Sequence, residues 1–279
     1  MKKGALYIVA TPIGNLNDIS FRAVDILKQV DCIAAEDTRH SIRLLKHLNF
    51  EKPLIPLHEH NEREESVKLL KRIEAGESIA IISDAGTPLI SDPGYHIVRL
   101  AHQNNIPVIP IPGPAALITA LSASGLPTDR FSFEGFLPAK EVAKQKALEL
   151  LAKEERTLIF YEAPHRVLET LQTMALVFGM DREATVAREL TKTFESIKWG
   201  KLSEILEWIN AHSDNQRGEF VIMVAGFKKQ SEAMLSPETE KLLKILLSEL
   251  SVKQAAGLAA KITGISRSVL YEYCINLNK

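Results

Sequence analysis

The stretch from Ile79 to Gly94 places the strongest constraint on the fold. It begins with Ile79-Ala80-Ile81-Ile82, an apolar run typical of a strand that is buried on both faces of its sheet. It continues with Ser, Asp, Gly, Thr and two prolines, which the interior of a strand or helix does not accommodate. Asp92-Pro93 then fits a helix N-cap followed by a proline in the first turn. The pattern predicts a buried strand, an exposed loop and a helix.

The position of this loop predicts a ligand site. In open α/β sheets, ligands bind beyond the carboxyl ends of the strands. Gly86 allows a ligand to approach the main chain closely, and Asp84 supplies a carboxylate where the strand ends. The alternative interpretation is a strand-to-helix turn that has no function beyond the connection.

Two further strands are expected to end in loops of the same kind. The apolar run 5–10 leads into Thr11-Pro12-Ile13-Gly14-Asn15, and the run 107–111 leads into Pro112-Gly113-Pro114-Ala115-Ala116. Three such loops on one sheet would lie side by side on one rim. Pro112-Gly113-Pro114 also fits a hinge between two halves of the chain, and the two interpretations are compatible.

Local patterns predict further elements in this half. A short strand at 32–35 ends in Glu36-Asp37-Thr38-Arg39, which is either a solvated loop or part of a site. Asn61 followed by Glu64 resembles a capping box at the start of a helix. A helix is expected at 20–30, and the residues predicted for its apolar face are Phe21, Val24, Leu27 and Val30.

The rest of the chain divides into two more parts. Strands are expected at 131–136, 156–161, 184–189, 194–200 and 218–226, with helices between them. After a polar linker near 228–232, the residues from 237 onward show only helical periodicity. A helix, a glycine-containing turn and a second helix indicate a helix-turn-helix, with a plain helical hairpin as the alternative. We therefore predict an α/β domain at 1–115, a second at 116–229 and a small helical domain at 235–279.

Composition limits the classes of function. The chain has 279 residues and a net charge of −1, so nucleic acid would have to be bound by local patches. One such patch is expected near the C-terminus. The segment from residue 253 onward contains four basic residues, Lys253, Lys261, Arg267 and Lys279, and one acidic residue, Glu272.

Other classes of protein lack support in the sequence. The two cysteines predict no disulfide framework, and we expect a reducing, cytoplasmic setting without a signal peptide or membrane span. His58-Glu59-His60 lacks a third ligand at a recognisable spacing, so no metal site is predicted. No GxGxxG, Walker A or Gly-x-Ser-x-Gly motif follows a predicted strand.

Six motifs in order give the chain a family likeness. Together they resemble the tetrapyrrole-methylase-like superfamily, and most closely its ribosomal RNA branch. The C-terminal segment is similar to the small helix-turn-helix domain of that branch. The motifs are Thr11-Pro12-Ile13-Gly14-Asn15-Leu16 with Asp18, Glu36-Asp37-Thr38-Arg39, Ser83-Asp84-Ala85-Gly86-Thr87-Pro88 through Ser91-Asp92-Pro93-Gly94, Pro112-Gly113-Pro114, Tyr161-Glu162-Ala163-Pro164-His165-Arg166 and Arg188-Glu189-Leu190-Thr191-Lys192.

The resemblance implies a fold and an activity. It implies two α/β domains with S-adenosylmethionine bound in the cleft between them, and a homodimer. It also implies 2′-O-methylation of a cytidine ribose in the decoding region of small-subunit ribosomal RNA, either free or in the 30S particle. Tetrapyrrole enzymes have a Gly-x-Gly-Pro-Gly type of first loop. The different loop here, Thr11-Pro12-Ile13-Gly14-Asn15, argues against a porphyrinoid substrate.

Site residues follow from the resemblance and from the chemistry. A ribose hydroxyl needs a base or accurate positioning, and the candidates for a base are Asp37, Asp84, Glu162 and His165. Phosphate contacts are expected from Arg39, Arg166, Arg188 and Lys192. The residues expected to bind S-adenosylmethionine are Pro12, Asp84, Ala85, Gly86, Thr87, Ile90, Ala115, Ala116, Tyr161 and Leu190.

Two alternative functions remain open at this stage. One is a tetrapyrrole methylase that acts on a porphyrinoid. The other is a regulator that binds DNA through the terminal helices and a small ligand through the α/β part.

Overall fold

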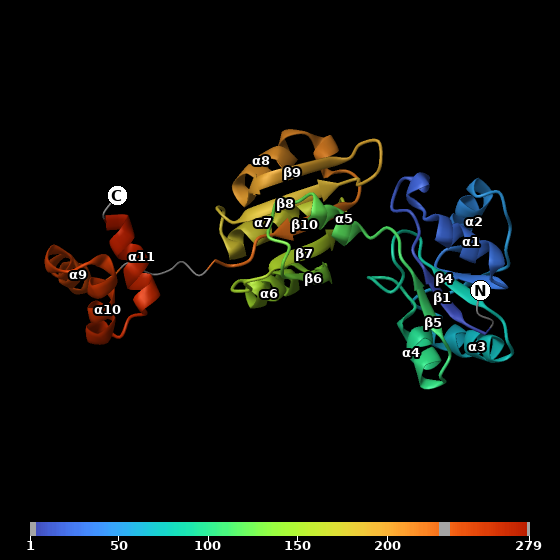
Figure 1. The fold of residues 1–279 in the computed structure, drawn as a ribbon. Helices are drawn as coiled ribbons and strands as arrows, with labels where there is room; N and C mark the ends of the chain where they lie inside the picture. The colour runs from blue at the N-terminus through green and yellow to red at the C-terminus, as the bar shows by residue number, and fades with distance from the viewer. Residues whose placement is uncertain (1–3, 229–234, 278–279) are drawn as a thin grey trace. The chain divides into compact units, whose positions relative to one another are not determined.

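The computed structural model describes residues 4–228 and 235–277 (Figure 1). The chain forms two compact units, which divide between residues 226 and 227. The larger unit contains two separate five-stranded sheets, and the smaller unit is helical. The expected combination of two α/β sheets and a terminal helical domain is therefore confirmed.

The first sheet is wholly parallel and has the order β3-β2-β4-β1-β5. Helices α1 and α2 share a core with one of its faces, and α3 and α4 share a core with the other. The bounds are β1 Leu6–Val9, α1 Phe21–Gln29, β2 Cys32–Ala35, α2 Thr38–His47, β3 Leu54–Pro56, α3 Glu62–Glu74, β4 Ile79–Ile82, α4 Tyr95–Gln103 and β5 Val108–Ile111, with a 3-10 turn at Leu16–Asp18.

This topology explains why loops gather at one rim. Strands β4, β1 and β5 are neighbours and run in the same direction, so their carboxyl ends lie at one edge. Strand β2 pairs with β4 on the other side, which brings Glu36-Asp37-Thr38-Arg39 to the same edge. The side-by-side placement of the three Gly/Pro-rich loops is confirmed.

The second sheet is mixed and has the order β6-β7-β10-β8-β9. Strands β6 and β7 are parallel, whereas the other neighbours are antiparallel. The bounds are α5 Ala116–Ser122, β6 Phe131–Phe136, α6 Glu141–Leu151, β7 Thr157–Glu162, α7 Val167–Phe178, β8 Glu183–Arg188, β9 Ser196–Lys201, α8 Leu202–Ala211 and β10 Phe220–Val224, with a 3-10 turn at Ser213–Gln216.

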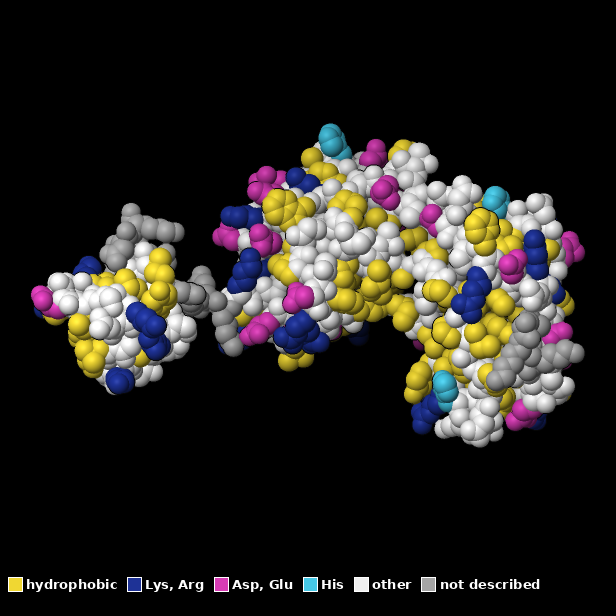
Figure 2. Space-filling model, in the orientation of Figure 1, with side chains coloured by type: hydrophobic (Ala, Val, Ile, Leu, Met, Phe, Trp, Pro, Cys, Tyr) yellow, Lys and Arg dark blue, Asp and Glu magenta, His cyan; other side chains and the backbone are white. Residues whose placement is uncertain are grey.

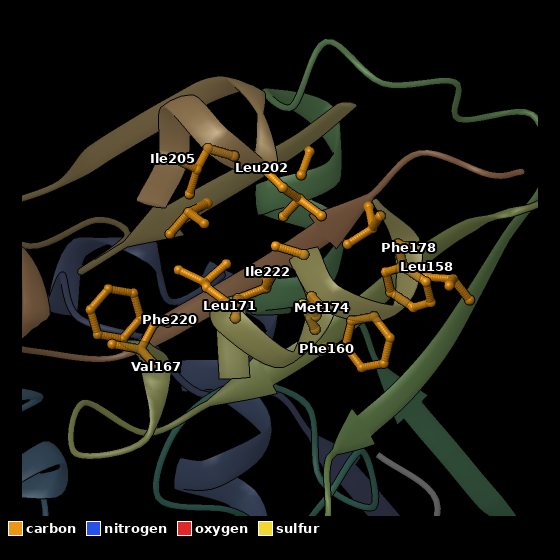
Figure 3. Close-up of a cluster of buried hydrophobic side chains, with 14 of the residues drawn as sticks. Leu158, Phe160, Val167, Leu171, Met174, Phe178, Leu202, Ile205, Phe220 and Ile222 are labelled. Atoms are coloured by element: carbon orange, nitrogen blue, oxygen red, sulfur yellow. The ribbon is translucent and has the colours of Figure 1, made fainter. Parts of the chain in front are cut away.

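Each face of the second sheet has its own core. On one face, Leu171 and Met174 of α7 pack with Phe160 and Ile222 of the strands, together with residues of α6 and α8 (Figure 3). On the other face, α5 packs with the sheet, and Ile13 from the first sheet's rim joins this cluster. The rim of the first sheet therefore contacts the second sheet through apolar side chains.

The smaller unit contains α9 Pro237–Glu249, α10 Val252–Thr263 and α11 Arg267–Leu277. Its own apolar core includes Leu243, Ala256 and Leu270, all fully buried. Most of the predicted linker, residues 229–232, and Lys279 of the predicted basic patch lie outside the described residues. No helix among the described residues is long and apolar enough to span a membrane.

One predicted helix start and one predicted capping box were wrong. Helix α4 begins at Tyr95, and its N-cap is Gly94 rather than Asp92. A carboxylate oxygen of Glu62 accepts the N–H groups of Gly94 and His96, each at 2.8 Å, so a distant side chain replaces a local cap. Helix α3 does begin after Asn61, which is its N-cap, but Asn61 forms no capping box, because its side-chain oxygen accepts the N–H of His58 at 2.9 Å.

The predicted apolar face of α1 was also partly wrong. Phe21 is 93% exposed, whereas Ala23 and Leu27 in the same helix are buried. The buried face is therefore rotated away from the position that Phe21 occupies.

Candidate functional site

Two adjacent cavities lie at the rim of the first sheet. The first has a volume of about 360 Å³ and the second about 340 Å³, and both fall within the usual size range of ligand pockets. The first cavity is lined by residues from both sheets, namely Ile13, Glu36, Asp84–Thr87, Ile90–Asp92, Ala115, Ala116, Phe136, Tyr161–Pro164, Ala187, Leu190 and Glu219–Val221.

Backbone hydrogen bonds join the loops after β1 and β4. The N–H of Thr11 donates to the carbonyl of Gly86 at 2.8 Å, and the N–H of Gly86 donates to the carbonyl of Thr11 at 3.1 Å. The Thr11 hydroxyl donates to the Ser83 carbonyl at 3.1 Å. Gly86 has a φ of +85°, a conformation that residues with a Cβ rarely adopt. The strand tips are therefore held as one rigid wall.

The third loop and the second sheet complete the first cavity. The Thr87 hydroxyl donates to the Pro114 carbonyl at 3.0 Å. The N–H of Leu117, in the first turn of α5, donates to the Tyr161 hydroxyl at 3.1 Å. The ring of Phe133 packs edge-on against Tyr161, with 4.8 Å between the ring centroids. Burial raises the pKa of Tyr161 above its usual value.

Three carboxylates at one edge of this cavity oppose one another. Burial raises the pKa of Asp92 to about 6, and the nearby charges of Glu36 and Asp84 contribute to the rise. Burial also raises the pKa of Glu36. Among the described residues that line the first cavity, there is no Lys, Arg or His. No basic side chain among these lining residues therefore balances the charges of Glu36, Asp84 and Asp92.

The predicted cofactor residues fall mostly in the first cavity. Nine of the ten line it, and Pro12 lines the second cavity instead. The sequence reasoning missed Glu36 and Asp92 as site residues. The sequence pattern assigns Asp92 to a helix N-cap. It leaves Glu36 in a segment that is either a solvated loop or part of a site. Their placement after adjacent parallel strands was the signal that could have found them.

Of the four candidate bases, Asp84 is the one that lines both cavities. Its Oδ1 accepts the backbone N–H of Asp37 at 3.1 Å. Its Oδ2 lies 3.8 Å from Nδ1 of His40. Asp84 is therefore held at the boundary between the two cavities, next to an imidazole.

The other three candidates are placed differently. Asp37 caps α2, and hydrogen bonds from Arg39 hold its pKa well below the usual range. Glu162 is buried and accepts the Thr170 hydroxyl at 2.6 Å. His165 is exposed and lines neither cavity. These contacts give Asp37 and Glu162 structural partners.

Two of the predicted phosphate-binding arginines contact backbone carbonyls. Arg166 donates from Nη2 to the carbonyl of Leu137 at 2.6 Å. Arg188 donates from Nε to the carbonyl of Arg217 at 2.6 Å and from Nη1 to that of Phe194 at 2.9 Å. Their position and hydrogen bonds are those of residues that hold loops in place.

The other two predicted cations have acidic partners, as does Arg166, whose Nε lies 3.3 Å from Oε1 of Glu162. The Nζ of Lys192 lies 2.9 Å from Glu189 and 3.0 Å from Glu219, and Lys192 lines the second cavity. Arg39 pairs with Asp37 at 2.8 Å, and its side chain is 88% exposed.

The fold and the cleft correspond to a known class of protein. The family described as Tetrapyrrole (Corrin/Porphyrin) Methylases matches residues 5–206, and an RsmI C-terminal HTH domain matches residues 233–278. A solved structure, uroporphyrin-III C-methyl transferase from Thermus thermophilus complexed with S-adenyl homocysteine, superposes with a TM-score of 0.54. It is 18% identical and covers 79% of this chain and 97% of its own, so this likeness supports the fold alone.

Curated relatives narrow the class. Ribosomal RNA small subunit methyltransferase I of Pseudomonas aeruginosa is 54% identical over 276 residues, which are 99% of this chain and 98% of the relative. The protein of the same name from Escherichia coli O157:H7 is 49% identical over 273 residues, 98% of this chain and 95% of the relative. The chain therefore belongs to the tetrapyrrole methylase family and, within it, to the family of ribosomal RNA small subunit methyltransferase I.

The raised pKa of Asp92 predicts a pH-dependent stability. A carboxyl whose pKa is higher in the folded state contributes stability below its unfolded pKa of about 4, and this contribution is lost as the pH rises through about 6. Asp92→Asn should therefore be more stable than the wild type at pH 7, by on the order of 1–2 kcal/mol, with less advantage at pH 4. Urea unfolding at both pH values measures this. Asp25→Asn, on the exposed surface of α1, is the control. An Asp92→Asn effect that is equal at both pH values would contradict the account.

Proposed function

We propose that the protein methylates the 2′-hydroxyl of a cytidine ribose in the decoding region of small-subunit ribosomal RNA. Membership of its family makes the chain an S-adenosylmethionine-dependent methyltransferase of small-subunit ribosomal RNA. The ribose position, the nucleotide and the decoding region are the proposed parts. The observation that carries the proposal is the acidic cavity at the rim, next to a second cavity of similar size.

The residues of the first cavity fit S-adenosylmethionine. This donor supplies a methyl group on a positively charged sulfur, and the carboxylates of Glu36, Asp84 and Asp92 match a cation. A Cβ on Gly86 would have only Ile13 and Pro114 within 4 Å, so glycine leaves the main chain of this loop accessible. Small residues in the third loop, Ala115 and Ala116, leave room at the start of α5.

The protein's part in the reaction is mainly alignment. The Thr11–Gly86 hydrogen bonds fix the wall behind the donor, so its position is set before the acceptor arrives. Tyr161 of β7 and Leu190, which follows β8, line the cavity from the side of the second sheet. The ribose proton must leave on the acceptor's side of the cleft, and Asp84 lies at that boundary.

An RNA acceptor fits this chain better than a porphyrinoid. The loop Thr11-Pro12-Ile13-Gly14-Asn15 lacks the glycine pattern of the tetrapyrrole enzymes. The helix-turn-helix match and the names of the curated relatives favour RNA as well. We propose the 30S particle as the natural form of the substrate, with the helical unit at 235–279 contributing to its capture. The proposed boundary between the two α/β domains lies at 115/116, where α5 begins to pack on the second sheet.

Product analysis tests the proposal directly. With labelled S-adenosylmethionine and small ribosomal subunits that lack the modification, the protein should transfer label to RNA. The modified linkage should resist alkaline hydrolysis, because cleavage needs a free 2′-hydroxyl. Label on a base would contradict the ribose assignment. Turnover of a porphyrinoid, or DNA binding without methyl transfer, would support one of the two alternative functions.

Gly86→Ala tests the placement of the donor, with Gly76→Ala as a matched control. Both glycines have positive φ, +85° and +101°, so each substitution should cost about 1–2 kcal/mol of stability. Gly76 has no atom within 4 Å of an added Cβ and lines neither cavity. Only Gly86→Ala should weaken S-adenosylmethionine binding in calorimetry, by about tenfold, or 1.4 kcal/mol. Equal affinities for the two variants would contradict this placement.

We further propose that the protein is a homodimer. Strand β9 lies at an edge of the second sheet, and Ile197 and Trp199, which share one of its faces, are 40% and 56% exposed. Phe194, just before this strand, is 71% exposed. An exposed apolar group of this kind on an edge strand is typical of a surface that another chain covers.

Trp199→Ser tests the dimer, with Leu150→Ser as the control. Leu150 is 88% exposed but lies on α6. This helix connects β6 and β7, which lie at the opposite edge of the sheet from β9. Light scattering after gel filtration should give a dimer mass for the wild type and Leu150→Ser. Trp199→Ser should shift the mass toward the monomer. A wild-type monomer would refute the dimer, and an unshifted Trp199→Ser would refute this interface.

A further inference from the structure

We propose that the second cavity binds the acceptor nucleotide, with His40 accepting the proton of the ribose hydroxyl and Arg43 contacting an RNA phosphate. The inference rests on the proposed ribose methylation and adds the residues that hold the acceptor. Neither residue was among the candidates from the sequence. Both belong to α2, which borders the second cavity.

The two cavities are placed for a transfer between them. They share Ile13, Asp84, Ala85 and Glu219 as lining residues, so one wall serves both. A methyl group held at this shared wall faces the second cavity directly. An in-line displacement needs the acceptor oxygen on the far side of the methyl carbon from the sulfur. Two adjoining cavities that share these lining residues place a ligand in one next to a ligand in the other.

The two cavities differ in the basic side chains that line them. The first carries carboxylates and, among its described lining residues, no basic side chain. The second is lined by His40, Arg43 and Lys192, and also by the shared carboxylates of Asp84 and Glu219. Lys192 already pairs with two glutamates, whereas Arg43 is exposed and forms no ion pair with any described residue. A cationic donor therefore fits the first cavity, and Arg43 is the group of the second cavity that can pair with an RNA phosphate.

Helix α2 is basic, although the protein as a whole has no excess of positive charge. Its sequence Thr-Arg-His-Ser-Ile-Arg-Leu-Leu-Lys-His contains no acidic residue, although the net charge of the protein is −1. Figure 2 shows Lys and Arg side chains dispersed over the visible face, without a single broad basic field. Buried Leu44 and Leu45 anchor the helix to the core, and His40 and Arg43 line the cavity.

The pairing of His40 with Asp84 is suited to proton transfer. Asp84 Oδ1 is fixed by the Asp37 N–H at 3.1 Å, and its Oδ2 lies 3.8 Å from His40 Nδ1. A carboxylate at one ring nitrogen orients the imidazole and stabilises its protonated form, which leaves the other nitrogen to act as the base. The His40 side chain is 54% exposed, so an acceptor can reach it.

The step balances as a displacement with proton loss. The bond between the methyl carbon and the ribose O2′ forms as the bond between that carbon and the donor sulfur breaks. The electron pair of the broken bond stays on sulfur, which becomes a neutral thioether. The hydroxyl proton passes to Nε2 of His40, and the imidazolium is stabilised by Asp84.

The first arm of the test measures RNA binding, which does not depend on activity. Unmodified small ribosomal subunits are titrated with Arg43→Gln and with Lys46→Gln, in the presence of S-adenosylhomocysteine. Lys46 is exposed on the same helix but is not among the residues that line the cavity. Lys46→Gln therefore removes one positive charge from α2, as Arg43→Gln does, without changing the lining of the cavity. Arg43→Gln should lower affinity about tenfold and reduce the salt slope by about 0.7, as expected for one lost phosphate contact. Equal losses in the two variants overturn the placement of the RNA.

The second arm measures turnover with His40→Gln and with His47→Gln. His47 is exposed at the end of α2 and does not line the cavity. His40→Gln should reduce kcat on the order of 10²-fold, while KM for the subunits and the affinity for S-adenosylmethionine change little. A kcat equal to that of His47→Gln overturns the role of His40. A wild-type protein that does not methylate ribose refutes the proposed function instead, and the binding arm still decides where RNA lies.

Discussion

The two backbone hydrogen bonds between Thr11 and Gly86 are the constraint on which the cleft depends. They join loops from neighbouring parallel strands, β1 and β4, and the Thr11 hydroxyl adds a contact to Ser83. Ile13, two residues further on, packs into the core of the second sheet. A short segment thus links the first sheet's rim to the opposite wall of the first cavity.

Electrostatic frustration in the first cavity follows from the same geometry. Parallel strands β2 and β4 bring Glu36 and Asp84 together at one edge, and the loop after β4 returns Asp92 to them. Burial disfavours the ionised forms of Glu36 and Asp92, and the pKa values of both carboxyls are therefore raised. A site of this kind is stabilised by a bound cation and stays under strain without one. The stability of the free protein and its affinity for the donor are therefore linked.

The sequence predicted the loops at the rim of the first sheet, but not the contacts that residues distant in the sequence make there. Runs such as Ile79–Ile82 identify buried parallel strands, and their Gly- and Pro-rich ends then predict one site, because parallel strands share an edge. Contacts between distant segments were beyond such rules. Glu62 caps α4 from 32 residues away, which no local capping pattern shows. His40 and Arg43 belong to no motif of the sequence analysis, and only the fold shows that α2 lies beside Asp84.

The central claim is that donor and acceptor occupy separate cavities on either side of the wall at Asp84 and Ala85. A crystal structure with S-adenosylhomocysteine and an RNA fragment that contains the target cytidine would test it most directly. The account predicts the thioether sulfur in the first cavity, near Asp84 and Asp92, and the ribose in the second, beside His40. A donor in the second cavity, or a ribose bound away from α2, would contradict it.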